Sequence, residues 1–134
     1  MEVRMVPLAA IWQMRQQVMY PSQPLKFVQL KNDPEGVHLG MYDNEILLSV
    51  ISLFRSGQEM QFRKFATKIE CQRKGIGSTL LKYVIDWTQA QDCALIWCNA
   101  RTTAMGLYKR FGMEPMGETW VENCIEYVKM QKAL

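Results

Sequence analysis

Two glycines in the segment QRKGIGST, residues 72–79, have the spacing of a loop that could hold an anion. Gly75 and Gly77 are separated by one residue and stand between an extended run and a helical run. Backbone N–H groups at a helix N-terminus have no partner within the helix, and with the helix dipole they favour a phosphate. Glycines let the backbone curl closely around such a group, because no Cβ stands in the way. The alternative is a plain glycine-rich turn before a helix.

Two common phosphate-binding fingerprints do not fit this segment. A Walker A loop needs Gly-Lys-Ser/Thr, whereas Gly77 directly precedes Ser78 and Lys74 lies before Gly75. A dinucleotide fingerprint needs G-x-G-x-x-G, but position 80 is Leu. The segment therefore predicts an anion site of another kind.

The cysteines and the single histidine form no recognised constellation. Cys71, Cys93, Cys98 and Cys124 contain no C-x-x-C pair, and His38 is remote from them in sequence. We therefore expect no zinc site or other metal site. Reduced, mostly buried thiols in a cytosolic protein are the expectation, and a Cys–His nucleophile is the alternative.

Composition limits the class of protein. The chain has 134 residues, about half of them apolar, and a net charge of +3. This length predicts one soluble globular domain, and the charge is too small to indicate a nucleic-acid partner. No apolar run approaches the roughly 20 residues of a membrane helix, and the N-terminus lacks the apolar run of a signal peptide. We expect a cytoplasmic protein with no membrane partner.

Hydrophobic periodicity predicts the element order β-α-β-β-β-α-β-α-β-β. Short turns join the middle strands into an antiparallel meander, and a helix between two later strands predicts a parallel βαβ unit. The last two strands read as a hairpin, so the fold class is α+β, layered α/β/α, with a mixed central sheet of six to seven strands. The expected strands span 1–6, 37–42, 45–55, 60–69, 93–98, 114–120 and 124–131; helices begin at Pro7 and span 77–90 and 102–111.

Arg15 departs from the apolar pattern of its helix, and the pair Phe62 and Phe65 departs from the alternation of its strand. Arg15 shares a face with the apolar residues of the first helix, so it either extends its stem to solvent, pairs with a carboxylate, or contacts an anion or substrate. Phe62 and Phe65 would fall on opposite faces of their strand, which is compatible with a β-bulge.

Two segments together resemble the GNAT acyltransferase superfamily. Gln72-Arg73-Lys74-Gly75-Ile76-Gly77 matches its Q/R-x-x-G-x-G/A signature. Residues 99–113, NARTTAMGLYKRFGM, are similar to its "AR…A…LYxxxGF" helix. The element order agrees as well, so the resemblance covers essentially the whole chain. It implies a single acetyltransferase domain over 1–134, of the small bacterial type.

The resemblance implies a site for acetyl-CoA as cosubstrate. The loop after the third meander strand would hold the pyrophosphate through backbone N–H groups, with added positive charge from Arg73 and Lys74. The preceding strand would diverge from its parallel neighbour, pair with the pantetheine arm and donate an N–H to the thioester carbonyl. The implied residues are Phe65, Ala66 and Thr67 on the strand and Gln72, Arg73, Lys74, Gly75, Ile76, Gly77 and Ser78 in the loop.

The implied reaction is acetyl transfer to a primary amine of a small molecule or peptide, by direct attack in a ternary complex. Tyr108 matches the tyrosine that protonates the leaving thiolate in this superfamily; its alternative role is to pack its helix on the sheet. Many relatives have Asn seven residues before this tyrosine, where this chain has Arg101. Asn99 could make that pantetheine contact instead, and Arg101 could bind an acidic group of the coenzyme or acceptor.

The sequence leaves the general base open among Glu59, Glu70, Glu118, His38 and a water chain. Cys98 reads as a small buried residue below the thioester. Arg15, Arg63 and Arg101 would line the acceptor rim and favour an acceptor with a carboxylate or phosphate.

Other functions remain open on the same fold. The first is a non-catalytic acyl-CoA-binding or regulatory module, and the second is a nucleic-acid or partner-binding module with an empty glycine loop. Exposed edge strands could also pair two copies into a homodimer.

Overall fold

The protein is built around one mixed sheet of seven strands, in the order β1-β2-β3-β4-β5-β7-β6. The computed structural model describes all 134 residues. The strands are β1 Glu2–Met5, β2 Val37–Asp43, β3 Ile46–Ser56, β4 Glu59–Thr67, β5 Leu95–Arg101, β6 Glu114–Glu122 and β7 Ile125–Ala133. Every neighbouring pair is antiparallel except β4 and β5. The predicted mixed sheet, with its meander, parallel βαβ unit and terminal hairpin, is confirmed.

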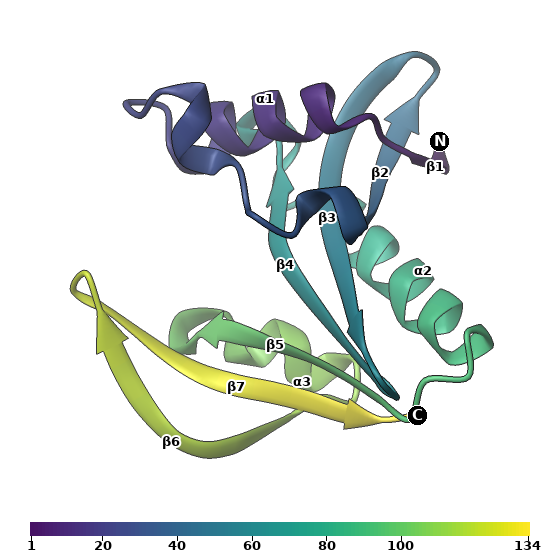
Figure 1. Ribbon diagram of the computed structural model, residues 1–134, viewed down its shortest axis with the longest axis vertical. Coiled ribbons are helices and arrows are strands. Elements are labelled where there is room, and N and C mark those ends of the chain that lie inside the picture. Colours follow the sequence, from purple (N-terminus) through teal and green to yellow (C-terminus); the bar gives the residue numbers. More distant parts are fainter.

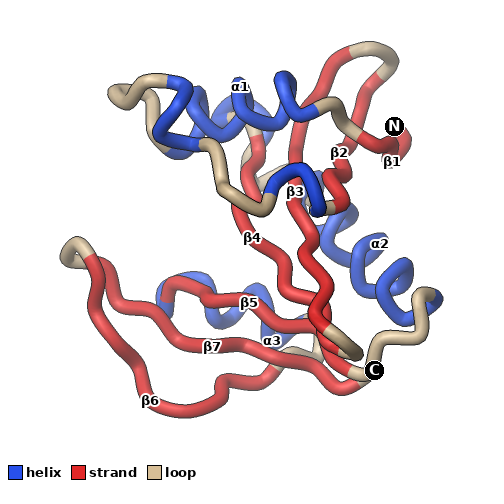
Figure 2. Tube along the Cα trace, in the orientation of Figure 1, coloured by secondary structure: helices blue, strands red, loops and turns tan.

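Helices cover the sheet on both faces, as Figures 1 and 2 show. Helix α1, Leu8–Met19, packs on one face through Ile11 and Met14, against Val50 and Ala66. Helix α2, Ile76–Ala90, and the short α3, Met105–Arg110, pack on the other. Single 3₁₀ turns lie at Leu25–Val28, Asp33–Glu35, Ile69–Cys71 and Thr102–Ala104. The order of layers confirms the α/β/α prediction.

The core explains why residues 76–90 form a helix. Leu80, Leu81 and Val84 recur at helical spacing and are all fully buried against the sheet. Burying each such side chain contributes about 1.5–3 kcal/mol relative to leaving it exposed. No helix of the protein combines the length and apolar character needed to cross a membrane.

Several predicted strand boundaries are wrong, and those of two strands bear on the site. The strand expected at 60–69 ends at Thr67, because residues 69–71 turn into a 3₁₀ helix. The strand expected at 93–98 runs from Leu95 to Arg101, since β7 pairs with it along that whole length. That pairing partner lies about 30 residues later in the chain, so the local pattern could not reveal it.

Candidate active site

The site begins where the parallel strands β4 and β5 separate. They pair only at Glu59–Leu95, Met60–Ile96 and Gln61–Trp97, and then diverge (Figures 1 and 2). A bulge in β4 lies opposite β3 between the pairs Ser52–Arg63 and Val50–Ala66, where Lys64 has a φ of 55°. A bulge bends its strand and increases the local twist. The side of β4 that faces β5 therefore carries no strand beyond Gln61, and the predicted bulge is confirmed.

The glycine loop follows β4 and leads into α2. Gly75 caps the helix with a φ of 80°, in the left-handed region that glycine adopts without strain. The N–H groups from Arg73 to Ser78 donate to no carbonyl or side chain of the protein. The first N–H with a backbone partner is that of Thr79, which donates to the Gly75 carbonyl at 3.0 Å. The loop is thus a row of free donors at the positive end of the α2 dipole, which suits an anion.

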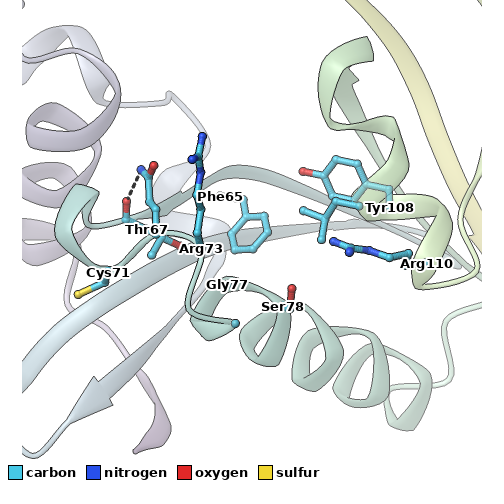
Figure 3. Close-up of a pocket in the computed structure, with 11 residues that line it drawn as sticks. Phe65, Thr67, Cys71, Arg73, Gly77, Ser78, Tyr108 and Arg110 are labelled. Atoms are coloured by element: carbon cyan, nitrogen blue, oxygen red, sulfur yellow. Dashed lines mark hydrogen bonds between the residues drawn. The ribbon is translucent and has the colours of Figure 1, made fainter.

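Local contacts hold the loop against the end of β4. Gln72 Nε2 donates to the Thr67 carbonyl at 3.0 Å, the dashed line in Figure 3. Gly77 approaches the strand so closely that a Cβ there would lie 3.1 Å from Thr67 Oγ1 and 3.2 Å from Phe65 Cζ. The second glycine therefore permits close packing of α2 on β4, whereas Gly75 permits the turn.

A pocket of about 400 Å³ opens between this loop and α3. Figure 3 shows Gly77 and Ser78 at the start of α2, Phe65 on the strand above, and Tyr108 and Arg110 on α3 across the space. The residues that line it are Phe65, Thr67, Cys71, Gln72, Arg73, Gly75, Gly77, Ser78, Leu107, Tyr108 and Arg110. The lining has two cations and no carboxylate, and neither Arg73 nor Arg110 takes part in an ion pair. Its charge therefore favours an anionic ligand.

Tyr108 lies in the wall of the pocket, across from the glycine loop. It is 9% exposed, and its hydroxyl points toward the Phe65 side of the pocket (Figure 3). Burial and, secondarily, the neighbouring Cys98 raise the pKa of Tyr108 well above its usual 10. The phenol therefore keeps its proton at neutral pH and can donate it. Burial also raises the pKa of the Cys98 thiol to about 12, so Cys98 is a protonated core residue rather than a nucleophile.

The pocket unites eight of the residues expected to bind the coenzyme or act on it: Phe65, Thr67, Gln72, Arg73, Gly75, Gly77, Ser78 and Tyr108. Ala66 and Ile76 are buried in the packing on opposite faces of the sheet, and the Lys74 side chain is exposed. Asn99 and Arg101 are exposed on β5 and do not line the pocket. A role in binding the coenzyme or acting on it stays a prediction for all thirteen residues.

Three lining residues received no role from the sequence: Cys71, Leu107 and Arg110. Leu107 and Arg110 are three residues apart on α3 and so share one side of the helix. Because the signature already assigned Tyr108 on α3 to the site, the sequence could have indicated that other residues of this helix line the pocket. Cys71 gave no such signal, because only the turn after β4 brings it to the pocket.

The expected role of Arg15 at the acceptor rim is wrong. Its side chain is fully buried and forms an ion pair with Asp33 at 2.8 Å, which was the carboxylate alternative. Arg15 Nη1 and Nη2 also donate to the Val28 carbonyl and to Ser52 Oγ, each at 2.9 Å. The guanidinium ties the 20–36 segment to α1 and β3 and has no free face for a ligand.

His38 belongs to the same buried network. Its Nε2 lies 2.8 Å from the Asp33 carbonyl and so donates to it, and its Nδ1 lies 2.7 Å from Ser52 Oγ. Both ring nitrogens are therefore occupied away from the pocket, which excludes a catalytic Cys–His pair in this structure. The candidate bases Glu59, Glu70 and Glu118 do not line the pocket either. The acceptor would enter from the other side of the gap, so the general base stays open among these carboxylates and a water chain.

Comparison with known families assigns the chain to one of them. The family model described as "Acetyltransferase (GNAT) domain" matches residues 14–134. The chain belongs to the GNAT acetyltransferase family. The glycine loop and the tyrosine helix of the predicted signature both lie inside the matched region.

Individual GNAT relatives are distant in sequence but similar in length and fold. The uncharacterized N-acetyltransferase YitI of Bacillus subtilis is 26% identical over 144 residues, covering 100% of this chain and 97% of that protein. A crystal structure from Lactobacillus plantarum, assigned as an N-acetyltransferase, has a TM-score of 0.89 at 18% identity, covering 99% and 97% of the two chains. A Bacillus subtilis acetyltransferase in complex with CoA has a TM-score of 0.78 at 18% identity, with 99% and 97% coverage.

Proposed function

We propose that this protein is an N-acetyltransferase, one domain over 1–134, that transfers an acetyl group from acetyl-CoA to a primary amine of a small molecule or peptide. The observation that carries the proposal is the run of free N–H groups from Arg73 to Ser78, opening into a pocket with Tyr108 on its far side. The CoA complex of a structural relative with the same fold supports this choice of cosubstrate. We expect the protein to act in the cytoplasm.

The residues present fit the coenzyme. The free N–H groups of the loop would bind the pyrophosphate, and Arg73 would add a charge-assisted hydrogen bond. The side of β4 beyond Gln61, which has no partner strand, would pair with the amides of the pantetheine arm. A backbone N–H near the bulge at Lys64 and Phe65 would polarise the thioester carbonyl.

Acetyl-CoA supplies the acetyl thioester, which a neutral amine attacks directly in a ternary complex as the C–S bond breaks. Tyr108 would give its proton to the leaving sulfur, which its raised pKa allows at neutral pH. The pocket walls of Phe65 and Leu107 would exclude water from the reacting atoms. No carboxylate lines the pocket, so the amine proton would pass to water, from which Tyr108 would recover the proton that it gave to the sulfur.

Two measurements on the purified protein test this function. The melting temperature should rise with acetyl-CoA and with CoA but not with NAD or ATP, because a ligand of the folded state stabilises it by mass action. A screen of amines should then detect release of the CoA thiol. The absence of a shift with either coenzyme would overturn the proposal. A shift without thiol release for any amine would instead favour the non-catalytic acyl-CoA-binding module.

A further inference from the structure

The sheet face formed by β5, β7 and β6 on the side of α1 has no helix over it. Along β5 the residues Ile96, Cys98 and Ala100 are buried toward α3, so the alternating residues face the other way. Figure 1 shows α3 behind β5 and β7 and no helix in front of them. We call this uncovered surface the open face; its central side chains are Trp97, Asn99, Arg101, Trp120, Tyr127 and Lys129.

The open face borders the gap between β4 and β5, where the acetyl group would lie. Trp97 pairs with Gln61 at the last point of contact between the two strands. Arg63, two residues further along β4, points to the same side as Gln61, because Met60 and Phe62 are buried on the α2 side. Lys64 also reaches the α1 side, where its Nζ donates to the Tyr20 hydroxyl at 3.0 Å. Cations therefore flank the gap from β4.

The opposite wall carries cations too. Arg101 follows Asn99 on β5, and Lys129 Nζ lies 4.6 Å from the centre of the Trp97 ring. Arg63, Lys64, Arg101 and Lys129 form no ion pair, whereas the ion pairs of this protein involve only Arg4, Arg15 and Lys82. The carboxylates on this side are Glu114 and Glu122 on the outer strand β6 and Glu59 at the start of β4, where β4 and β5 are still paired. The gap therefore opens onto a surface with an excess of unpaired positive charge.

We propose that the acceptor carries an anionic group, a carboxylate or phosphate, in addition to its amine. This inference rests on the proposed function and names the substrate class of that site. The unpaired cations would bind the anion, while Trp97 and the stacked pair Trp120–Tyr127, with ring centres 5.9 Å apart, offer flat apolar surface to the rest of the molecule.

The same cations would also favour the neutral form of the acceptor amine, which is the form that attacks the thioester. An amine attacks only in its neutral form, and nearby positive charges lower the pKa of an amine. A pocket without a carboxylate base is consistent with this arrangement, because the acceptor amine would lose its proton to water more readily. A polycationic acceptor would be repelled by the same four side chains.

A matched series of acceptors tests the charge preference: 4-(aminomethyl)benzoate, benzylamine and 4-(aminomethyl)benzylamine, which differ in the charge of one para substituent. The readout is kcat/KM for CoA thiol release at fixed acetyl-CoA. We expect the carboxylate to exceed the neutral amine by about tenfold, with the dication lowest. Raising the salt concentration should reduce the difference, since these charges are partly exposed. O-Phosphoethanolamine against ethanolamine repeats the comparison with a phosphate.

Substitutions assign the preference to the open face. Arg63→Gln and Lys129→Gln should each lower the ratio of kcat/KM for the carboxylate to that for benzylamine severalfold and leave the CoA-induced melting shift unchanged. Lys82→Gln, on the solvent side of α2, is the matched control and should change neither acceptor. Three outcomes would overturn this inference and leave the proposed function standing: equal use of the three benzylamines, preference for the dication, or a carboxylate preference that both substitutions leave intact. A protein that gives no melting shift with CoA would overturn the proposed function, and this inference with it.

Discussion

Arg15 and Arg73 stand in opposite electrostatic surroundings. Arg15 is fully buried, faces Asp33 through two hydrogen bonds of 2.8 and 3.0 Å, and donates two more to Val28 and Ser52. Arg73 lies at the pocket with no ion-pair partner, beside backbone N–H groups that are also free. Both regions hold positive charge, but only one has its counter-charge built in.

This difference separates a structural network from a binding site. Burying a charge without a partner is very costly. The Arg15 guanidinium is buried together with the Asp33 carboxylate, which neutralises it. Donors that face a solvent-filled pocket are hydrated and cost little to leave unpaired. Their convergence from one short loop indicates that a ligand completes them. The ion-paired guanidinium therefore belongs to the fold, and the converging free donors of the loop mark the candidate site.

The largest expected effect is on the buried pair. Arg15→Ala leaves the Asp33 carboxylate buried without its partner and should lower the free energy of unfolding by about 3–5 kcal/mol. Arg73→Ala should change it by less than about 0.5 kcal/mol, because Arg73 has no partner in the protein. Urea denaturation measures both. For CoA the order should reverse: Arg73→Ala should weaken binding about tenfold, whereas folded Arg15→Ala should bind normally. Similar losses of stability in the two variants would contradict the distinction between Arg15 as a structural residue and Arg73 as a binding residue.

Tyr108→Phe should affect catalysis more than stability. Loss of the proton donor should lower kcat by about 10²–10⁴. The ring is retained in its buried site, so the CoA-induced melting shift should persist. Tyr83→Phe is the matched control, because Tyr83 is an exposed residue of α2 and its variant should keep full activity. A Tyr108→Phe enzyme with wild-type kcat would leave Tyr108 with only the packing role.

Gly75→Ala tests whether the turn or the ligand needs the glycine. A Cβ at Gly75 meets no atom within 4 Å, so the cost is the left-handed backbone at φ 80°, about 1–2 kcal/mol. Gly57→Ala is the control, since Gly57 has a φ of 59°, equally open surroundings and a place in the β3–β4 turn. Both variants should lose similar stability, but only Gly75→Ala should weaken the CoA-induced melting shift. An equal CoA response in both variants would show that the loop geometry does not matter for the coenzyme.

The sequence could predict the elements whose signals are local. The apolar spacing of α2, the short turns of the meander and the Gly75–Gly77 pair are all contained in a few residues. The signature and the tyrosine helix also predict that Tyr108 and the loop belong to one site. The bulge could be predicted too: Phe62 and Phe65 would fall on opposite faces of a regular strand, and the bulge lets their rings pack 6.5 Å apart on one face.

The sequence could not predict what depends on distant partners. The end of β5 depends on β7, and the role of Arg15 depends on Asp33, which lies 18 residues away across an irregular segment. The sequence allowed Arg15 a carboxylate partner but did not say which one, and it allowed Arg15, Arg63 and Arg101 alike a place at the acceptor rim. Only tertiary packing shows that the first is neutralised in the core while the other two remain unpaired.

The smallest expected effect is a pH dependence that belongs to the buried pair. Burial alone would raise the pKa of Asp33, but hydrogen bonds from Arg15, Trp12 and the Leu30 N–H outweigh it and lower the pKa below 3.8. The unfolded chain therefore binds this proton first as the pH falls, so stability is lost on acidification. The difference in unfolding free energy between wild type and Asp33→Asn should be constant above about pH 5 and narrow toward pH 3. Asp86→Asn, in an exposed pair with Lys82, should show almost no difference at any pH. An Asp33→Asn difference that widens in acid would mean that Arg15 does not stabilise the ionised carboxylate.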